Sequence, residues 1–273
     1  MSEIMIASKH GDIAIQMAGE TGPALLFVHG NSASKEVWHK QFTSGLAANH
    51  RLIAMDLAGH GASEDAPDPK ASYCMAGYAD AAIAVLNGLG IERAVIVGWS
   101  LGGHVAIEMM PHFSGIAGIV LTGTPPIHRA SMDDISAGFH MNETTALAGQ
   151  ELWNAEEAGR FSGTALEPGA PVADWVLKGA LRTDGRAPRM MFAAFVAGEG
   201  GDQAEILAQT SVPTAVINGA AEQFVNNEFI GAATYGNLWR GQVHLMDGLG
   251  HAPFWQAPEE YNAMLESFAA EVI

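Results

Sequence analysis

The stretch GWSLGG at residues 98–103 constrains the fold of this chain more than any other feature. An apolar run at residues 94–97 precedes it, and residues 104–110 have the composition of a helix. A serine between a buried strand and a helix start lies on a tight, strained turn, so the residues two positions away must be nearly free of side chain. Gly98 and Gly102 meet this requirement. The stretch therefore predicts a nucleophile elbow at Ser100, where the helix start favours a nearby oxyanion.

Short apolar or alternating runs recur along the rest of the chain. They predict strands at residues 4–7, 12–17, 24–29, 51–56, 94–97, 118–122, 214–218 and 242–246. The first two are typical of a hairpin that turns at Gly11, whereas the continuously apolar runs at 25–28 and 52–55 are typical of buried parallel strands. Helical spacing is present at residues 37–48, 78–89 and 258–272. This alternation of strand and helix predicts a doubly wound α/β sheet.

The alternation stops after Thr124. From residue 125 to about residue 209 the sequence is helical and amphipathic, without a clear buried strand, and the strand pattern resumes at residue 214. Connections in α/β units are normally two to six residues long, so an interruption of roughly eighty residues indicates an inserted unit. We therefore predict a core formed by residues 1–124 and 210–273 and a helical cap inserted at residues 125–209.

The composition limits the partners that such a chain can have. Of its 273 residues, 48% are hydrophobic and 16% are charged, which allows a large buried core. The formal net charge of −17 repels phosphate backbones and anionic lipid headgroups, and no run approaches the ~20 apolar residues needed to cross a bilayer. We expect no nucleic-acid or membrane partner, and a neutral or apolar small molecule as substrate.

The cysteine and histidine patterns bear on location and cofactors. Cys74 is the single cysteine, and residues 1–10 lack the basic start and apolar run of a signal peptide, so we expect a cytoplasmic protein. The 11 histidines show neither H-x-H nor H-E-x-x-H spacing, and no dinucleotide-binding fingerprint is present. We therefore expect chemistry that needs no metal and no other cofactor.

A serine hydroxyl becomes a good nucleophile only when a base removes its proton, and the base needs a third group to orient it. His251, in GLGHAP at residues 248–253, follows the last predicted strand and is the candidate base. Glu222 follows the strand at 214–218 and is the candidate acid, because its rival Asp247 is too close to His251 to reach round to its ring. The chain order serine, acid, histidine supports this assignment.

An oxyanion needs two preorganised N–H donors. The Leu101 N–H at the elbow is one candidate, and the other is the Asn31 N–H in HGNS at residues 29–32. Whether the Asn31 side-chain amide also orients substrate or water stays open. Three other polar residues near the predicted sheet edge are interpreted as structural: His29, Asp56 and His60. His104, on the helix after the elbow, is interpreted as a core residue.

Together, four features resemble the α/β-hydrolase fold superfamily over the whole length of the chain: HGN at 29–31, DLAGHG at 56–61, the elbow, and GH at 250–251. The resemblance implies a mostly parallel eight-stranded sheet flanked by helices, with an inserted helical cap. Four stretches resemble, more narrowly, the metal-independent N-acyl-homoserine lactonases of this fold: GWSLGGH at 98–104, LTGTPP at 121–126, ALAGQE at 146–151 and GNLW at 236–239. The resemblance extends to the acid, because those lactonases use a glutamate and EQFV at 222–225 occupies the matching position in this chain.

This narrower resemblance implies a quorum-quenching serine hydrolase. It would open the lactone ring of N-acyl-homoserine lactones through Ser100, His251, Glu222 and an acyl-enzyme. Apolar residues of the predicted cap are candidates for an acyl pocket, or else form the cap's own core: Phe139, Met141, Leu147, Trp153, Phe161 and Met191. Two alternatives stay open, namely another hydrolase of this fold (a carboxylesterase, an amidase or a carbon–carbon bond hydrolase) and a non-catalytic small-ligand receptor.

Overall fold

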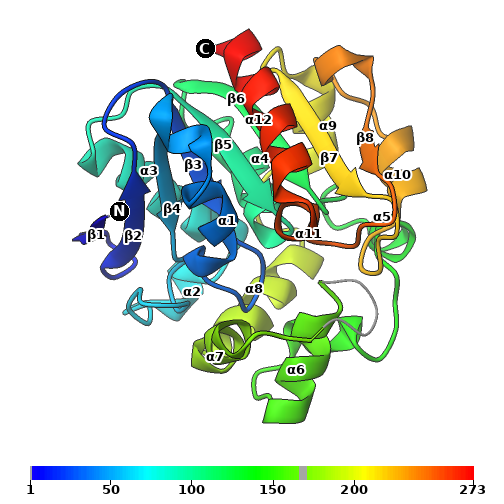
Figure 1. Ribbon diagram of the computed structural model, residues 1–273. Helices are drawn as coiled ribbons and strands as arrows, with labels where there is room; N and C mark the ends of the chain where they lie inside the picture. Colours follow the sequence, from blue (N-terminus) through cyan, green and yellow to red (C-terminus); the bar gives the residue numbers. More distant parts are fainter. Residues whose placement is uncertain (1, 166–170) are drawn as a thin grey trace.

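The computed structural model describes residues 2–165 and 171–273, and in this part of the chain eight strands form one sheet (Figure 1). The strands are β1 (Ser2–Ile6), β2 (Ile13–Ala18), β3 (Ala24–Val28), β4 (Arg51–Met55), β5 (Ala94–Trp99), β6 (Ile116–Thr122), β7 (Thr214–Gly219) and β8 (His244–Met246). Their order across the sheet is β1-β2-β4-β3-β5-β6-β7-β8. β2 pairs antiparallel with β1 and β4, and every other neighbouring pair is parallel. The predicted fold class and mostly parallel sheet are confirmed.

Helices fill most of the connections. They are α1 (His39–Phe42), α2 (Pro69–Ser72), α3 (Met75–Gly88), α4 (Leu101–Met109), α5 (Met132–Gly138), α6 (Ala155–Gly163), α7 (Asp174–Arg182), α8 (Arg186–Val196), α9 (Gln203–Gln209), α10 (Asn227–Ala232), α11 (Pro253–Gln256) and α12 (Pro258–Val272). Short 3₁₀ helices are η1 (Lys35–Trp38), η2 (Gly45–Ala48), η3 (Thr145–Gly149) and η4 (Trp239–Gly241).

The single helix predicted at residues 37–48 was wrong, because η1, α1 and η2 replace it. The hydroxyl of Ser44 donates a hydrogen bond to the Gln41 carbonyl and accepts one from the Leu46 N–H. Serine side chains that bond to nearby backbone groups in this way compete with continuous helix.

Both faces of the sheet are covered, and β3 shows why its sequence is continuously apolar. Leu26 belongs to a buried cluster that includes Tyr78 of α3, whereas Phe27 belongs to the cluster on the other face. The ring of Phe27 lies 5.2 Å from that of Trp38 in η1. Because successive strand residues point to opposite faces, burial on both sides leaves no position for a polar residue.

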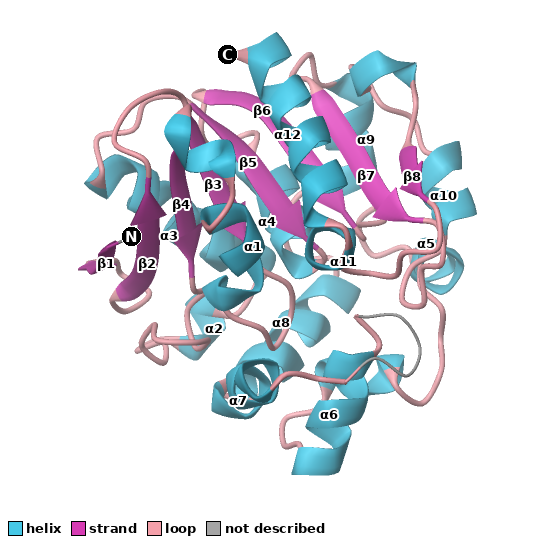
Figure 2. Ribbon diagram, viewed as in Figure 1, coloured by secondary structure: helices cyan, strands magenta, loops and turns pink. Residues whose placement is uncertain are grey.

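Between β6 and β7, the described residues form helices joined by loops (Figure 2). Figure 1 shows α6, α7 and α8 beyond the carboxyl ends of the parallel strands, whereas α9 packs back against α4. In the described residues, no helix combines the length and the apolar character that a membrane span requires.

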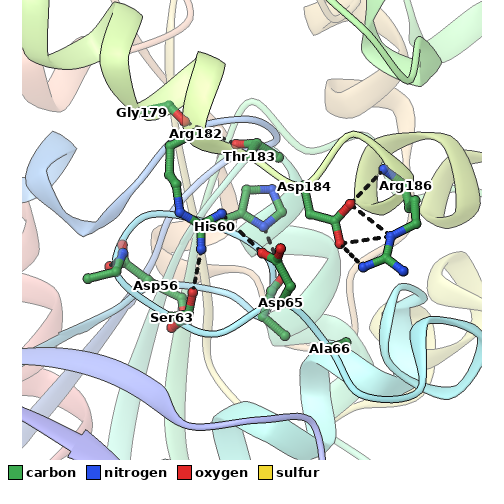
Figure 3. Close-up of polar contacts among 12 residues, drawn as sticks. Asp56, His60, Ser63, Asp65, Ala66, Gly179, Arg182, Thr183, Asp184 and Arg186 are labelled. Atoms are coloured by element: carbon green, nitrogen blue, oxygen red, sulfur yellow. Dashed lines mark hydrogen bonds and ion pairs between the residues drawn. The ribbon is translucent and has the colours of Figure 1, made fainter.

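Arg182, the last residue of α7, and Asp184, two residues later, connect this segment to residues that follow β4, and Figure 3 shows the contacts of Arg182. The Arg182 guanidinium donates to the Ser63 carbonyl at 2.9 Å and to the Asp65 carboxylate at 3.1 Å. The Asp184 carboxylate accepts a hydrogen bond of 2.5 Å from the Tyr73 hydroxyl. We refer to these contacts of Arg182 and Asp184 as the α7 anchor.

Candidate active site

Ser100 lies in a strained turn between β5 and α4. Its φ is 53° and its ψ is −116°, a conformation that residues with a side chain rarely adopt. A Cβ at Gly98 would collide with the Gly102 carbonyl, and a Cβ at Gly102 would collide with the Val28 carbonyl of β3. The tight turn that the two glycines predict is therefore present, and it places Ser100 at the carboxyl edge of the sheet.

His251 and Glu222 lie on two other loops at the same edge and are joined by a hydrogen bond. The distance between His251 Nδ1 and Glu222 Oε2 is 2.8 Å, and the two side chains are only 4% and 1% exposed. The second carboxylate oxygen accepts hydrogen bonds from the N–H groups of Gln223 and Phe224, at 2.8 and 2.7 Å. With the carboxylate fixed in this way, Nδ1 carries the proton and the lone pair of a neutral ring lies on Nε2.

The electrostatics of Glu222 favour its ionised form. Burial by itself raises the pKa of this carboxyl, but the charge of His251 and the hydrogen bonds from His251, Phe224 and Gln223 outweigh it. The net result is a pKa below the ordinary glutamate value. A carboxylate that stays ionised next to the imidazole can stabilise an imidazolium when His251 takes up a proton.

Two aromatic residues contact His251. The indole Nε1 of Trp99 donates to the His251 carbonyl at 2.9 Å, and the Phe224 ring lies 4.8 Å from the imidazole. Sequence reasoning did not identify these residues, although one is adjacent to Ser100 and the other lies two positions after Glu222. The available signal was therefore proximity along the chain to the elbow and to the acid.

A cavity of about 350 Å³ brings four of the predicted site residues together: Ser100, His251, Asn31 and Leu101 all line it. Leu101 is the first residue of α4, and the first N–H groups of a helix have no partner within it. Asn31 follows β3, and the next residue, Ser32, has a φ of 51°, so this turn is also strained. Glu222 lies behind His251.

The side-chain amide of Asn31 is engaged with the helical segment. Its Nδ2 donates a hydrogen bond of 2.8 Å to the carbonyl of Ala148 in η3. The Ser32 hydroxyl donates to Asn31 Oδ1 at 3.3 Å. The amide therefore links the loop after β3 to η3, and both residues line the cavity.

The six candidates for an acyl pocket separate into two groups. Phe139, Met141, Phe161 and Met191 line the cavity, whereas Leu147 and Trp153 do not. The Trp153 ring lies 4.6 Å from that of Phe161, and its Nε1 donates to the Leu147 carbonyl. This pair therefore supports the wall from behind.

The model of the alpha/beta hydrolase family matches residues 25–264, which is most of the chain. The chain belongs to the alpha/beta hydrolase family. This finding confirms the membership that the elbow, HGN, DLAGHG and GH motifs predict.

Among solved structures, the hydrolase is similar to AidH, an N-acyl homoserine lactonase, in complex with N-butanoyl homoserine. The two are 41% identical, with a TM-score of 0.95 over 100% of this chain and 97% of that one. Two further AidH structures are 40% identical to it; a serine-to-glycine variant is complexed with N-hexanoyl homoserine lactone and a glutamate-to-glycine variant with N-hexanoyl homoserine.

Among curated proteins, the hydrolase is 30% identical over 261 residues to a pimeloyl-[acyl-carrier protein] methyl ester esterase of Nitrosomonas europaea, covering 91% of this chain and 96% of that protein. It is also 41% identical over 100 residues to an uncharacterized protein of Mycobacterium tuberculosis. That match covers 37% of this chain and 28% of the relative's length.

The other histidines near the edge of the hydrolase's sheet differ in their surroundings. His29 is fully buried; burial lowers its pKa to about 4, and its Nε2 accepts a hydrogen bond from the Leu57 N–H, as a structural residue would. His104 is buried too, but it lines the cavity as well, which a pure core residue would not do. In the described part of the chain, no group of three or more histidine, cysteine, aspartate or glutamate side chains is placed to hold a metal ion.

Proposed function

We propose that this hydrolase opens the lactone ring of N-acyl-homoserine lactones, with Ser100 as nucleophile, His251 as base and Glu222 as the acid that orients it. The observation that carries the proposal is the Glu222–His251 hydrogen bond of 2.8 Å at a mainly apolar cavity that both His251 and Ser100 line. The similarity to AidH over the whole chain supports the choice of substrate.

In the first step, Ser100 Oγ attacks the lactone carbonyl carbon while His251 Nε2 takes its proton. The carbonyl oxygen gains negative charge, and the N–H groups of Leu101 and Asn31 stabilise it, each donor contributing about 3 kcal/mol. Glu222 stabilises the imidazolium that forms. A tetrahedral intermediate results, in which Oγ is bonded to the former carbonyl carbon.

In the second step, the bond between this carbon and the ring oxygen breaks. The His251 imidazolium gives its proton to the departing oxygen, which becomes the hydroxyl of the opened ring. The opened ring remains attached to Ser100 as an ester. Water, deprotonated by His251, then attacks this ester and releases N-acyl-homoserine together with the free Ser100 hydroxyl.

We also propose that residues 125–209 act as a cap on a core of residues 1–124 and 210–273. This division is supported by the position of α6 to α8 beyond the strand ends and by the Asn31–Ala148 hydrogen bond across the cavity. α9 contributes differently, because it packs against α4. We propose a small acyl lactone as the substrate and a cytoplasmic location for the enzyme.

The decisive experiment measures proton release when the purified chain is mixed with butanoyl-, hexanoyl- and octanoyl-homoserine lactones. Opening a lactone at neutral pH releases one proton and adds one water, which mass spectrometry detects in the product. We expect release that a chelator does not reduce and that Ser100→Ala abolishes. A matched control is Ser162→Ala, because Ser162 also lines the cavity but belongs to α6.

Three outcomes would replace the proposal. Free fatty acid and homoserine lactone as products would identify an acylase. Hydrolysis of simple esters without hydrolysis of lactones would identify a carboxylesterase, the activity class of the Nitrosomonas relative. Binding of lactones without turnover, unchanged in Ser100→Ala, would identify a receptor.

A further inference from the structure

His104 presents a hydrogen-bond acceptor to the cavity. Its Nδ1 lies 2.6 Å from Oε1 of Gln203 on α9, a residue that does not line the cavity. Nε2 has no hydrogen-bond partner among the described residues. It is not one of the unpartnered side-chain atoms that protein atoms cover completely, so part of its surface is accessible. Nε2 is therefore open to the cavity, on the side of the ring away from Gln203.

The protonation state of this ring follows from its surroundings. Burial lowers the pKa of His104 to about 4, so the ring is neutral at pH 7. A neutral ring that donates its Nδ1 proton to the Gln203 oxygen has its lone pair on Nε2. Nε2 can therefore accept a hydrogen bond but cannot donate one.

The wall around this acceptor is apolar. The His104 ring lies 5.2 Å from the Phe195 ring and 6.2 Å from the Phe139 ring, and both phenylalanines line the cavity. A polar atom in such surroundings is costly unless a partner satisfies it. A hydroxyl group on the acyl chain of a ligand would be such a partner.

His104 lies on α4 four residues after Ser100, the N-cap of that helix, and four helical residues rise about 6 Å along the axis. In an acyl-homoserine lactone, the third carbon of the acyl chain is five bonds from the lactone carbonyl carbon. An extended chain advances about 1.2 Å per bond, so this carbon lies about 6 Å from the point of attack. The reach of the acyl chain is therefore of the same order as the backbone rise from Ser100 to His104.

We propose that His104 Nε2 accepts a hydrogen bond from a 3-hydroxyl group on the acyl chain, so that this enzyme selects 3-hydroxyacyl lactones over unsubstituted and 3-oxo lactones. The inference rests on the proposed lactonase function. An unsubstituted chain leaves Nε2 unpaired, and a 3-oxo group places a second acceptor opposite it. The neutral ring and the Gln203 contact keep Nε2 in the acceptor form.

The experiment compares kcat/KM for 3-hydroxyoctanoyl-, octanoyl- and 3-oxooctanoyl-homoserine lactone in the wild-type enzyme and in three variants. His104→Asn keeps a donor near Nδ1 for Gln203 but removes the cavity acceptor. His104→Gln keeps a polar group near Nε2 and removes the contact with Gln203. His104→Phe keeps a ring between Phe139 and Phe195 without either nitrogen, and provides the same test if the asparagine variant does not fold.

We expect the ratio of 3-hydroxyoctanoyl to octanoyl kcat/KM to fall about tenfold in His104→Asn and His104→Phe, the loss of one hydrogen bond, and to be largely retained in His104→Gln. An unchanged ratio in the first two variants, or an equal loss on all three lactones, would overturn the inference. If the wild-type enzyme hydrolyses octanoyl lactone but either of these two outcomes is found, the inference about His104 fails and the proposed lactonase function stands. If the wild-type enzyme hydrolyses no lactone, the proposed function fails with it.

Discussion

The loops at the carboxyl edge of the sheet and the helices beyond that edge are built in different ways. At the edge, the Glu222 and His251 side chains are almost fully buried and are joined at 2.8 Å. In the helical segment, Leu152 is 79% exposed and Met141 is 63% exposed, and the ion pair of the α7 anchor lies near the surface. The contrast teaches that loops at the ends of buried parallel strands hold the proposed reacting groups in fixed positions, whereas more exposed helices form walls of the cavity.

The largest expected effect is that of Ser100→Ala. Loss of the nucleophile should lower kcat by roughly 10⁶-fold, because the other members of a triad cannot act alone. The far-ultraviolet circular dichroism spectrum should not change, since the turn is fixed by Gly98 and Gly102. Retention of more than about one hundredth of the activity would contradict the role given to the sheet edge.

Glu222→Gln should lower kcat by roughly 10⁴-fold. The amide keeps the shape of the side chain but no longer stabilises the required tautomer and the imidazolium of His251. Steady-state kinetics at saturating lactone measure this loss. Glu228→Gln, on α10 beyond the same loop, is the matched control and should leave kcat close to the wild-type value.

Stability in acid provides a third test of the sheet edge. The folded-state pKa of Glu222 is lowered, so its contribution to the free energy of unfolding is complete above about pH 4.5. It is lost as the pH falls through the lower folded-state pKa. Urea unfolding from pH 7 to pH 3 should show the wild-type enzyme losing stability relative to Glu222→Gln in acid. If the difference in the free energy of unfolding between the wild-type enzyme and Glu222→Gln stayed constant from pH 7 to pH 3, the ionised form of Glu222 would not be favoured in the folded state.

The buried half of the α7 anchor should contribute less. In Tyr73→Phe, the hydroxyl that donates to Asp184 and accepts from the Ala66 N–H is lost. We expect the free energy of unfolding to fall by about 1–2 kcal/mol, because a buried N–H remains unpaired. Urea unfolding at pH 7 measures this fall in the free energy of unfolding. Tyr235→Phe is the control, since that hydroxyl donates to the Ile230 carbonyl and its loss leaves no N–H group unpaired among the described residues.

The smallest expected effect belongs to the exposed half of the anchor. The Arg182 and Asp65 side chains are 41% and 52% exposed, so Arg182→Ala should cost less than about 1 kcal/mol. The loss should shrink further at high salt. A cost as large as that of Tyr73→Phe would show that the helical segment is held as firmly as the sheet edge and would remove the contrast.

The elbow and the position of the proposed acid could be predicted because the sequence signals are local. Ser100 is fixed by steric demands on Gly98 and Gly102, and Glu222 follows its strand within a few residues. The strand pattern also predicted the sheet, because strands that are buried on both faces are encoded as short, continuously apolar runs. The split of the helix expected at 37–48 was missed, since the hydrogen bonds of one serine outweighed the apolar spacing.

The sequence by itself therefore determined the fold class, the strained turn at Ser100 and the loops that carry His251 and Glu222. Only the tertiary structure decided that Phe161 lines the cavity while Trp153 supports it from behind, and that His104 is open to the cavity through Nε2. The physical reason is that a turn or a strand obeys backbone sterics over a few residues. An apolar helix face can pack against a neighbour or line a cavity equally well, and contacts between distant segments make that choice.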